Sequence, residues 1–205
     1  MSVFDFPIMS IDGSTNLMDL ARGNTCLFVN ISSKCGYEPQ CSRVWSYART
    51  SRQLWELQQL HEMFKDFLVI GFPCNQFGGQ EPSENNAINA FIKKAYPFVT
   101  FPISEKIEVN GESEHPIYTY LKGPEKRLVD DTTADSSESA LRGQNKAGQA
   151  MYRIPHNYEK FLVSNTGNMV ARFSWRDLPL AEKPISSGSF LTVIETVKLY
   201  AELSK

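Results

Sequence analysis

Short apolar runs alternate along the chain with segments in which apolar residues recur every three or four positions. Residues 26–31 and 67–72 are continuous apolar runs bounded by turn-forming residues, as is typical of strands buried on both faces. Between them, residues 53–66 predict a helix, because their apolar residues all fall on one side of it. These residues are Leu54, Leu57, Leu60 and Phe64.

A second helix is predicted after the second apolar run. Ser83 can cap it at the N-terminus. Its apolar stripe consists of Ile88, Phe91, Ile92 and Ala95. The order strand, helix, strand, helix favours parallel strands joined by right-handed crossovers, with helices on the faces of the sheet.

The C-terminal half predicts antiparallel pairing. Residues 161–163 and 169–173 are short apolar strands joined through the turn residues 165–168, which is typical of a hairpin. Residues 189–203 predict a final amphipathic helix. The fold class is therefore α/β, with a mixed central sheet flanked by helices.

Three further segments complete the predicted organisation of a single domain over residues 1–205. Residues 3–20 contain an Asp-Gly turn between two short apolar runs and predict an N-terminal hairpin. Insertions are expected near residues 41–51 and 123–152. We interpret the second as a long mobile loop, because the polar run 130–139 has too little apolar surface to offset the entropy of ordering.

Composition and charge narrow the function classes. The 205 residues include 21 Lys and Arg against 23 Asp and Glu, a net charge of −2, so nucleic acid is not an expected partner. No apolar stretch approaches the ~20 residues of a membrane span, and no secretory signal is evident. Four cysteines are too few for a disulfide scaffold, which favours a reducing, cytoplasmic location. They are Cys26, Cys35, Cys41 and Cys74.

Cys35 is the strongest candidate nucleophile. It follows a predicted buried strand and precedes a predicted helix, where free N–H groups and the helix dipole favour a thiolate. Lys34 adds positive charge, and Gly36 allows the tight turn that would expose the sulfur. Cys26 lies within a strand and is interpreted as a small buried apolar residue.

A second polar motif follows the other predicted parallel strand. Residues 72–82 read FPCNQFGGQEP, with amide side chains and a glycine pair directly after the strand. In open α/β sheets, ligands bind at the carboxyl ends of the strands, so this motif and Cys35 are expected at one edge.

These motifs resemble those of the glutathione peroxidase family in its cysteine form. The resemblance lies in residues 30–37 (NISSKCGY) and 72–82, and continues along most of the chain outside the two insertions. Further matching segments are residues 101–111 (FPISEKIEVNG), 115–118 (HPIY) and 157–163 (NYEKFLV).

The resemblance implies a thioredoxin-like fold and the reduction of hydrogen peroxide or organic hydroperoxides by a thiol. It implies that Cys35 is the peroxidatic residue, that Gln76 donates a hydrogen bond to its sulfur, and that Asn157 is a further donor. The family has a tryptophan where this chain has His156. No prosthetic cofactor or metal is implied, and glutathione or thioredoxin would serve as co-substrate.

The residues themselves indicate how such a site would work. When a thiolate attacks a peroxide, the O–O bond breaks and the departing oxygen must be protonated as sulfur becomes sulfenic acid. The amides of Gln76 and Asn157 can stabilise the developing charge without burying a counter-ion. His156 has a ring N–H and can carry the proton itself.

The reductant and two other functions stay open at this point. The resemblance implies that thioredoxin-dependent members have a resolving cysteine on the helix after the second motif. The predicted helix here contains none, which favours direct reduction by glutathione, although Cys41 or Cys74 can be considered as resolving thiols. One alternative is thiol-disulfide exchange through a Cys35–Cys41 bridge. Another is a redox sensor with low turnover. The sequence leaves the oligomeric state undetermined.

Overall fold

The central sheet of the computed structural model has the strand order β2-β1-β5-β6. Strand β1 is parallel to β2 and antiparallel to β5, and β5 is antiparallel to β6, which confirms the predicted mixed sheet. The strands are β1 (Thr25–Ile31), β2 (Phe67–Pro73), β5 (Lys160–Val163) and β6 (Met169–Phe173). The structure describes residues 1–35, 50–123, 142–144, 150–181 and 192–203.

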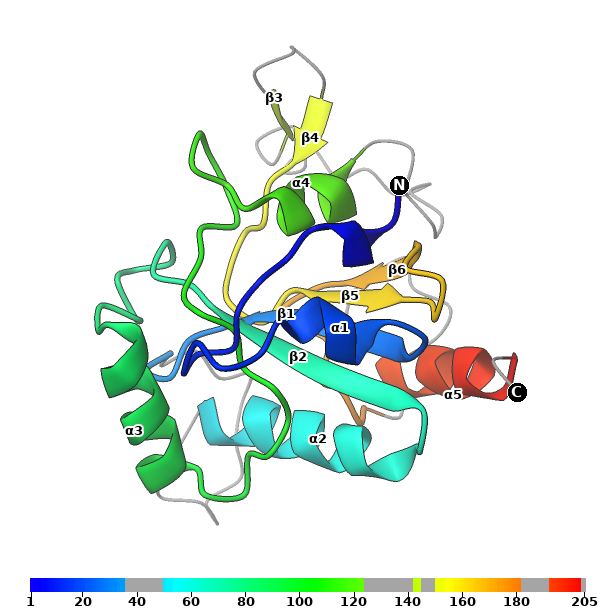
Figure 1. The fold of residues 1–205 in the computed structure, drawn as a ribbon, viewed down its shortest axis with the longest axis horizontal. Coiled ribbons are helices and arrows are strands. Elements are labelled where there is room, and N and C mark those ends of the chain that lie inside the picture. The colour runs from blue at the N-terminus through cyan, green and yellow to red at the C-terminus, as the bar shows by residue number, and fades with distance from the viewer. Residues whose placement is uncertain (36–49, 124–141, 145–149, 182–191, 204–205) are drawn as a thin grey trace.

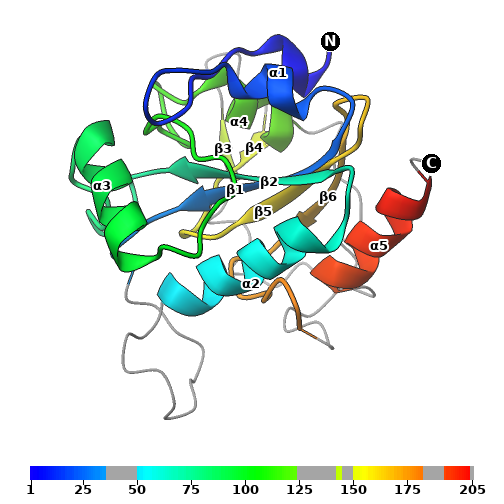
Figure 2. The same cartoon turned by 60° about the horizontal axis from the view of Figure 1, so that its bottom comes forward.

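Helices cover both faces of this sheet (Figures 1 and 2). The helices are η1 (Val3–Asp5), α1 (Leu17–Ala21), α2 (Thr50–Met63), α3 (Asn85–Ala95), α4 (Pro116–Lys122) and α5 (Val193–Leu203). Helices α2 and α5 lie on one face, α1 and α4 on the other, and α3 stands beside the edge toward which β1 and β2 run. The sheet is therefore the middle layer of three.

Alternation along the strands divides the apolar core in two. In β1, Cys26 and Phe28 face the layer of α1 and α4, whereas Leu27, Val29 and Ile31 face α2 and α5. Successive side chains of a strand point to opposite faces, so a continuous apolar run serves both layers. This explains why apolar residues do not alternate with polar ones along residues 26–31 and 67–72.

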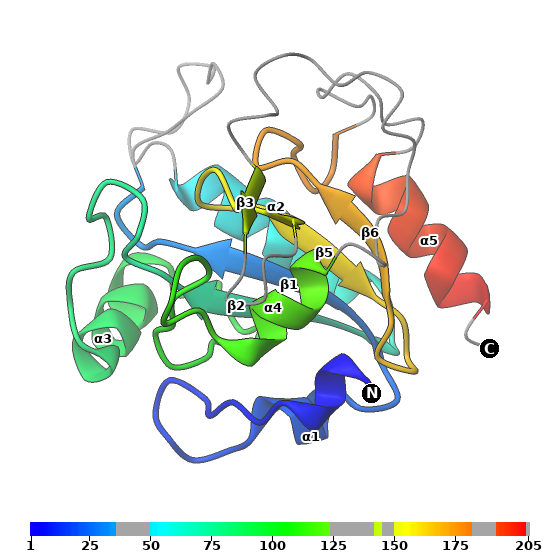
Figure 3. The ribbon, with the colours of Figure 1, turned by 90° about the horizontal axis from the view of Figure 1, so that it is seen from above.

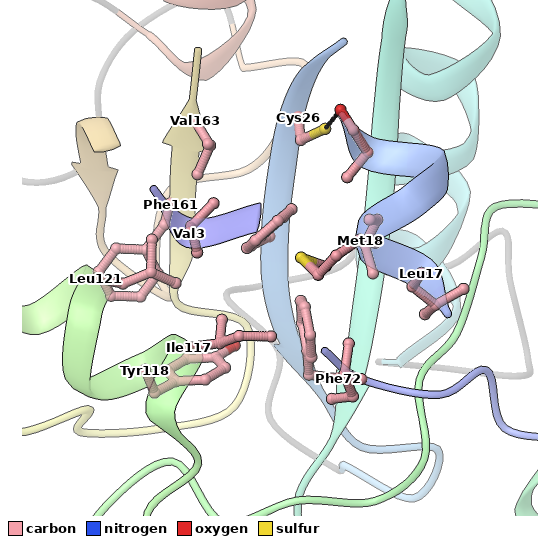
Figure 4. Close-up of a cluster of buried hydrophobic side chains, with 14 of the residues drawn as sticks. Val3, Leu17, Met18, Cys26, Phe72, Ile117, Tyr118, Leu121, Phe161 and Val163 are labelled. Carbon is pink, nitrogen blue, oxygen red and sulfur yellow. Dashed lines mark hydrogen bonds between the residues drawn. The ribbon is translucent and has the colours of Figure 1, made fainter. Parts of the chain in front are cut away.

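Tyr118 of α4 anchors one of these two layers (Figure 4). Its ring meets Phe72 of β2 at a centroid distance of 5.6 Å and Phe161 of β5 at 5.9 Å, both edge to face. Edge-to-face contacts are a preferred geometry for aromatic pairs. Helix α4 is thereby fixed over the middle of the sheet.

The N-terminal segment differs from the predicted hairpin. The Asp-Gly turn forms, with Gly13 at φ 72°, but only a single antiparallel bridge joins Met9 to Asn16. The second arm then becomes α1, because the Asn16 side chain accepts hydrogen bonds from the backbone of Met18 and caps the helix. A local capping residue thus replaces the second strand.

Helix α3 also differs in detail from its prediction. Its N-cap is Glu84 rather than Ser83, and no side chain caps it. Ile88 and Ile92 are buried as expected, but Phe91 is 39% exposed. The buried stripe is narrower than predicted because α3 lies beside the edge of the sheet rather than across a face.

Part of the second insertion is ordered. Within residues 123–152, the short strands β3 (Arg142–Gln144) and β4 (Ala150–Tyr152) pair antiparallel, so the prediction of one continuous mobile loop is wrong there. Backbone pairing can form with few apolar side chains, which is why composition did not indicate it. The polar run 130–139 lies outside the described residues.

Helices long and apolar enough to cross a membrane do not occur in the part of the chain that the structure describes.

Candidate active site

Three loop segments meet at the sheet edge beside α3 because of the strand register (Figure 3). Ile31 at the end of β1 is paired with Pro73 at the end of β2, so the residues that follow each strand emerge together. Strand β5 runs in the opposite direction and begins here, with Lys160 opposite Val29. The Cys35 segment, the second motif and residues 156–159 are thus neighbours, as the sequence predicts for the first two.

Cys35 lies just beyond β1 at this edge of the sheet and is buried. Its side chain is 3% exposed and belongs to an apolar cluster that includes Ile31 and Tyr158. The predicted exposure of the sulfur is therefore wrong, because apolar neighbours cover it. The next described helix, α2, begins only at Thr50. The positions of Gly36 and Cys41 lie outside the described residues.

Side chains of the second motif hold the segment that leads to Cys35. The carboxylate of Glu81, which is fully buried, accepts hydrogen bonds from the Ser33 backbone N–H at 2.5 Å and from its hydroxyl at 2.7 Å. The Ser32 hydroxyl donates to the Gln80 backbone carbonyl at 2.6 Å. Hydrogen bonds to a buried carboxylate are strong, so the two motifs are rigidly joined.

Two tyrosines complete this attachment. The Tyr158 hydroxyl donates to the Ser32 carbonyl at 2.9 Å, and the Tyr96 hydroxyl donates to the Ser33 carbonyl at 3.2 Å. The Tyr158 backbone N–H also donates to the Asn30 carbonyl at 2.6 Å. The carbonyls of Ser32 and Ser33, which follow β1, are thus satisfied by side chains from remote segments.

Asn157 and Gln80 form a polar pair at this edge. Asn157 is completely buried, and its Nδ2 donates to Gln80 Oε1 at 2.9 Å. Its Oδ1 is buried and has no hydrogen-bond partner among the described residues. An unpaired buried acceptor costs roughly 1–3 kcal/mol, so a ligand that brings an O–H or N–H donor would be stabilised here.

Gln76 does not join this pair. Its side chain is exposed and lies against residues 108–110, where Oε1 accepts from the backbone N–H groups of Val109 and Asn110 at 2.9 and 3.0 Å. Its Nε2 donates to the Asn110 carbonyl at 2.7 Å. Both ends of the amide are therefore occupied in holding a neighbouring loop, and Gln80 is the glutamine of this motif that pairs with Asn157.

His156 lies beside Asn157 in a stack of aromatic rings. Its imidazole is 4.7 Å from the ring centroid of Trp175, with an angle of 26° between the planes. Phe77 of the second motif lies nearly parallel as well, at 6.2 Å and 20°. The predicted neighbours His156 and Asn157 are thus brought to the same edge as the second motif.

Two other cysteines lie in the apolar core on the α1 and α4 side of the sheet. Cys26 and Cys74 are fully buried, and desolvation raises the pKa of each thiol. Because the thiolate is the nucleophile, a raised pKa lowers the reactivity of both sulfurs. Cys26 donates to the Ala21 carbonyl of α1 (Figure 4), which is a structural role.

A buried lysine lies just behind the site. Lys160 begins β5 with 0% exposure, and its Nζ donates to the Tyr158 carbonyl at 2.8 Å. Burial lowers its pKa to about 8, while Asp177, Glu159 and Glu56 partly oppose this shift. Because the folded chain releases this proton at a lower pH than the unfolded chain, the free energy of unfolding is expected to depend on pH in the alkaline range.

Sequence reasoning missed Gln80 and Trp175. Gln80 was available in the motif, but periodicity does not indicate which glutamine of a turn faces inward. The predicted hairpin could have indicated Trp175. In a hairpin, the residues that follow the second strand return to the edge where the first strand begins. Groups of three or more residues suited to hold a metal ion do not occur among the described residues.

Comparisons with known proteins show which family the chain resembles. A family model described as glutathione peroxidase matches residues 3–122. A glutathione peroxidase-like peroxiredoxin of Chlamydomonas reinhardtii, GPX5, is 37% identical over 165 residues, covering 80% of each chain. The thioredoxin/glutathione peroxidase BtuE of Escherichia coli is 34% identical over 202 residues, covering 97% of this chain and 96% of its own.

A solved structure supports the fold. The crystal structure of Trgpx in apo form is 24% identical and has a TM-score of 0.59, covering 98% of this chain and 96% of that chain. The likeness confirms the predicted thioredoxin-like α/β fold.

Proposed function

Because the chain belongs to the glutathione peroxidase family and is thus a peroxidase, we propose that it reduces hydrogen peroxide and organic hydroperoxides through Cys35. The observation that carries this proposal is the Asn157–Gln80 amide pair, in which Asn157 is fully buried and Gln80 half-buried, at the sheet edge where the Cys35 segment is held. Neutral amide donors beside a nucleophilic sulfur suit a reaction in which negative charge passes from sulfur to oxygen.

The reaction proceeds in two stages. The Cys35 thiolate attacks the terminal peroxide oxygen, an S–O bond forms, and the O–O bond breaks to release an alkoxide or hydroxide. The leaving oxygen takes a proton and departs as alcohol or water, and Cys35 is left as a sulfenic acid. A thiol then condenses with the sulfenic acid, and a second thiol restores Cys35 by thiol-disulfide exchange.

Gln80, Asn157 and His156 serve the first stage in this proposal. Because Gln80 Oε1 accepts from Asn157, its amide nitrogen is the group proposed to donate to the developing charge. The unpartnered Asn157 Oδ1 is suited to accept a hydrogen bond from the hydroperoxide O–H. His156 is the group that can supply the proton to the leaving oxygen.

A small thiol such as glutathione is the proposed direct reductant. Helix α3 contains no cysteine, so a resolving thiol is absent from that part of the described chain. Cys74 is fully buried with a raised pKa and is poorly suited to attack a sulfenic acid. Thioredoxin stands as the second candidate reductant. Buried thiols outside disulfides, such as Cys26 and Cys74, are consistent with a reducing compartment such as the cytoplasm.

A peroxide-consumption assay tests the proposal. The chain is supplied with hydrogen peroxide or an organic hydroperoxide and with either glutathione or a thioredoxin system. Cys35→Ser is expected to abolish turnover with both reductants, whereas Cys74→Ser is expected to keep it, because a hydroxyl can replace the thiol that donates to Gln76. Full activity of Cys35→Ser would contradict the proposal.

The burial of Cys35 favours one alternative, a redox sensor that is oxidised by peroxide but turns over slowly. The same assay separates the two functions. Multiple turnover with either reductant excludes the sensor, whereas one oxidation per chain followed by no turnover supports it. Peptide mapping under non-reducing conditions would then show whether a Cys35–Cys41 bridge forms.

A further inference from the structure

A fourth segment reaches the active-site edge from the end of β6. Phe173, the last residue of β6, is paired with Lys160, the first residue of β5, so residues 174–176 emerge beside residues 156–159 (Figure 3). Strand direction alone therefore brings Trp175 to the site. This segment belongs to neither of the two motifs that carry the cysteine and the amides.

The backbone of Trp175 is fixed by two buried polar side chains. Its N–H donates to Glu159 Oε2 at 3.0 Å, and its carbonyl accepts from Gln53 Nε2 at 3.2 Å. Glu159 and Gln53 are each 5% exposed, and Glu159 is also paired with Arg172 at 2.7 Å. Buried groups of this kind are conformationally restrained, so the indole is presented in a defined position.

The Trp175 indole in turn restrains His156. The two rings are nearly parallel with centroids 4.7 Å apart, and Phe77 adds a second nearly parallel ring. Stacked aromatic neighbours resist rotation of the imidazole out of their plane. The His156 backbone is held separately, because its carbonyl accepts from Asn30 Nδ2 of β1 at 2.9 Å.

We propose that Trp175 is a positioning residue that holds the His156 imidazole beside the Asn157–Gln80 pair for proton delivery. This inference rests on the proposed peroxidase function. As the Cys35 sulfur bonds to the terminal oxygen and the O–O bond breaks, the leaving oxygen takes the proton of the imidazolium. Sulfur loses two electrons to the peroxide, and the neutral imidazole regains a proton from solvent.

Three single variants test the positioning role. Trp175→Leu removes the aromatic face and is expected to lower kcat/KM for peroxide by about 10- to 100-fold, less than the roughly 10²- to 10⁴-fold that a general acid itself contributes. Trp175→Phe keeps a ring against His156 and is expected to stay within about threefold of the parent. Trp55→Leu is the matched control, because Trp55 lies on α2 and is 47% exposed. An unchanged rate for Trp175→Leu would overturn the proposal.

A double-mutant cycle with His156 separates positioning from general support of the fold. If Trp175 acts through the imidazole, Trp175→Leu is expected to cause no further loss in a His156→Gln chain. Losses that multiply in the double variant would overturn the proposal, because Trp175 would then act independently of His156. A wild-type chain that consumes no peroxide would instead refute the proposed function itself.

Fluorescence tests the stack without any turnover. The sequence contains only three tryptophans, so Trp45→Phe with Trp55→Phe leaves Trp175 as the sole emitter. His156→Gln in this chain is expected to move the emission maximum to longer wavelength, since the face of the indole that the imidazole covers becomes accessible to water. An unchanged spectrum would contradict the stacking on which the proposal depends.

Discussion

The two ends of the central sheet are built in different ways. At the end where β1 and β2 finish, side chains remote in sequence hold the backbone, as Glu81 does for Ser33 and Tyr158 for Ser32. At the opposite end, the turn between β5 and β6 is closed by its own backbone, and the Gly167 carbonyl also accepts from the Val3 N–H at 3.0 Å and the Tyr120 hydroxyl at 3.2 Å. Ser164 N–H donates to the Asn168 carbonyl, and Gly167 N–H donates to the Ser164 carbonyl, both at 2.8 Å.

The two ends therefore differ in what a substitution is expected to change, the reaction rate at one end and the free energy of unfolding at the other. The remote side chains at the site end are polar, and one of their atoms, Asn157 Oδ1, lacks a partner among the described residues. An unpaired buried acceptor lowers folding stability unless a ligand satisfies it. The opposite end consists of tightly packed turns, where a substitution should change the free energy of unfolding without changing the rate of each folded molecule.

The largest expected effect distinguishes two glutamines of one motif. Gln80→Ala is expected to lower the second-order rate constant for peroxide by about 10²- to 10³-fold, as for loss of one donor to developing charge. Gln76→Ala is expected to leave that rate within a few-fold and to cost about 1 kcal/mol of stability, because its hydrogen bonds hold residues 108–110. Stopped-flow kinetics and urea unfolding measure the two quantities.

The reverse pattern would contradict the account of the site. A rate that falls with Gln76→Ala but not with Gln80→Ala would return the donor role to Gln76, as the sequence alone suggested. Equal losses of rate in both variants would mean that the loop 108–110 also shapes the site.

The next effect is expected at the opposite end of the sheet. Gly167 has φ +80°, and an added Cβ would lie 1.9 Å from Ser2 Oγ and 2.8 Å from a ring carbon of Phe4. Gly167→Ala is therefore expected to cost about 2–4 kcal/mol in the free energy of unfolding. Gly13→Ala is the matched control, since φ is +72° but nothing lies within 4 Å, so only about 1 kcal/mol is expected.

Activity of the Gly167→Ala chain sharpens the comparison. At a temperature where the variant is folded, its peroxide rate per molecule is expected to equal that of the parent. A rate that falls with stability would show that the two ends of the sheet are coupled.

The smallest effect concerns Lys160 and alkaline pH. Burial lowers its pKa to about 8, below the ordinary lysine value, so above about pH 8 the folded chain has released a proton that the unfolded chain still holds. The free energy of unfolding should therefore rise with pH in this window, by about 2 kcal/mol between pH 8 and pH 9.5. Below pH 8 both states are charged and this contribution is flat.

Lys160→Met provides the comparison for that measurement. The variant lacks the titrating group, so the difference in unfolding free energy between the two chains isolates Lys160 from other groups that titrate at high pH. Urea unfolding of both chains from pH 7 to 9.5 gives the difference. If the unfolding free energies of the two chains changed with pH in parallel, Lys160 would not titrate with a lowered pKa in the folded chain.

The sequence predicted the locally determined parts of the fold. The apolar runs of β1 and β2, the β5–β6 hairpin and the apolar face of α2 follow from periodicity, which each segment carries by itself. A capping residue changed the type of one element, because Asn16 caps a helix where the second arm of a hairpin was expected. The site could be predicted only in part, because Gln76 and Gln80 are equally polar turn residues whose directions depend on segments remote in sequence.

The central claim is that Cys35 is the sulfur that peroxide oxidises first. Brief exposure of the chain to one equivalent of hydrogen peroxide, followed by trapping of sulfenic acids and mass spectrometry of the cysteine peptides, tests it most directly. The account predicts that the first oxygen is found on Cys35, while Cys26 and Cys74 are unmodified. Oxidation of Cys74 or Cys41 ahead of Cys35 would contradict it.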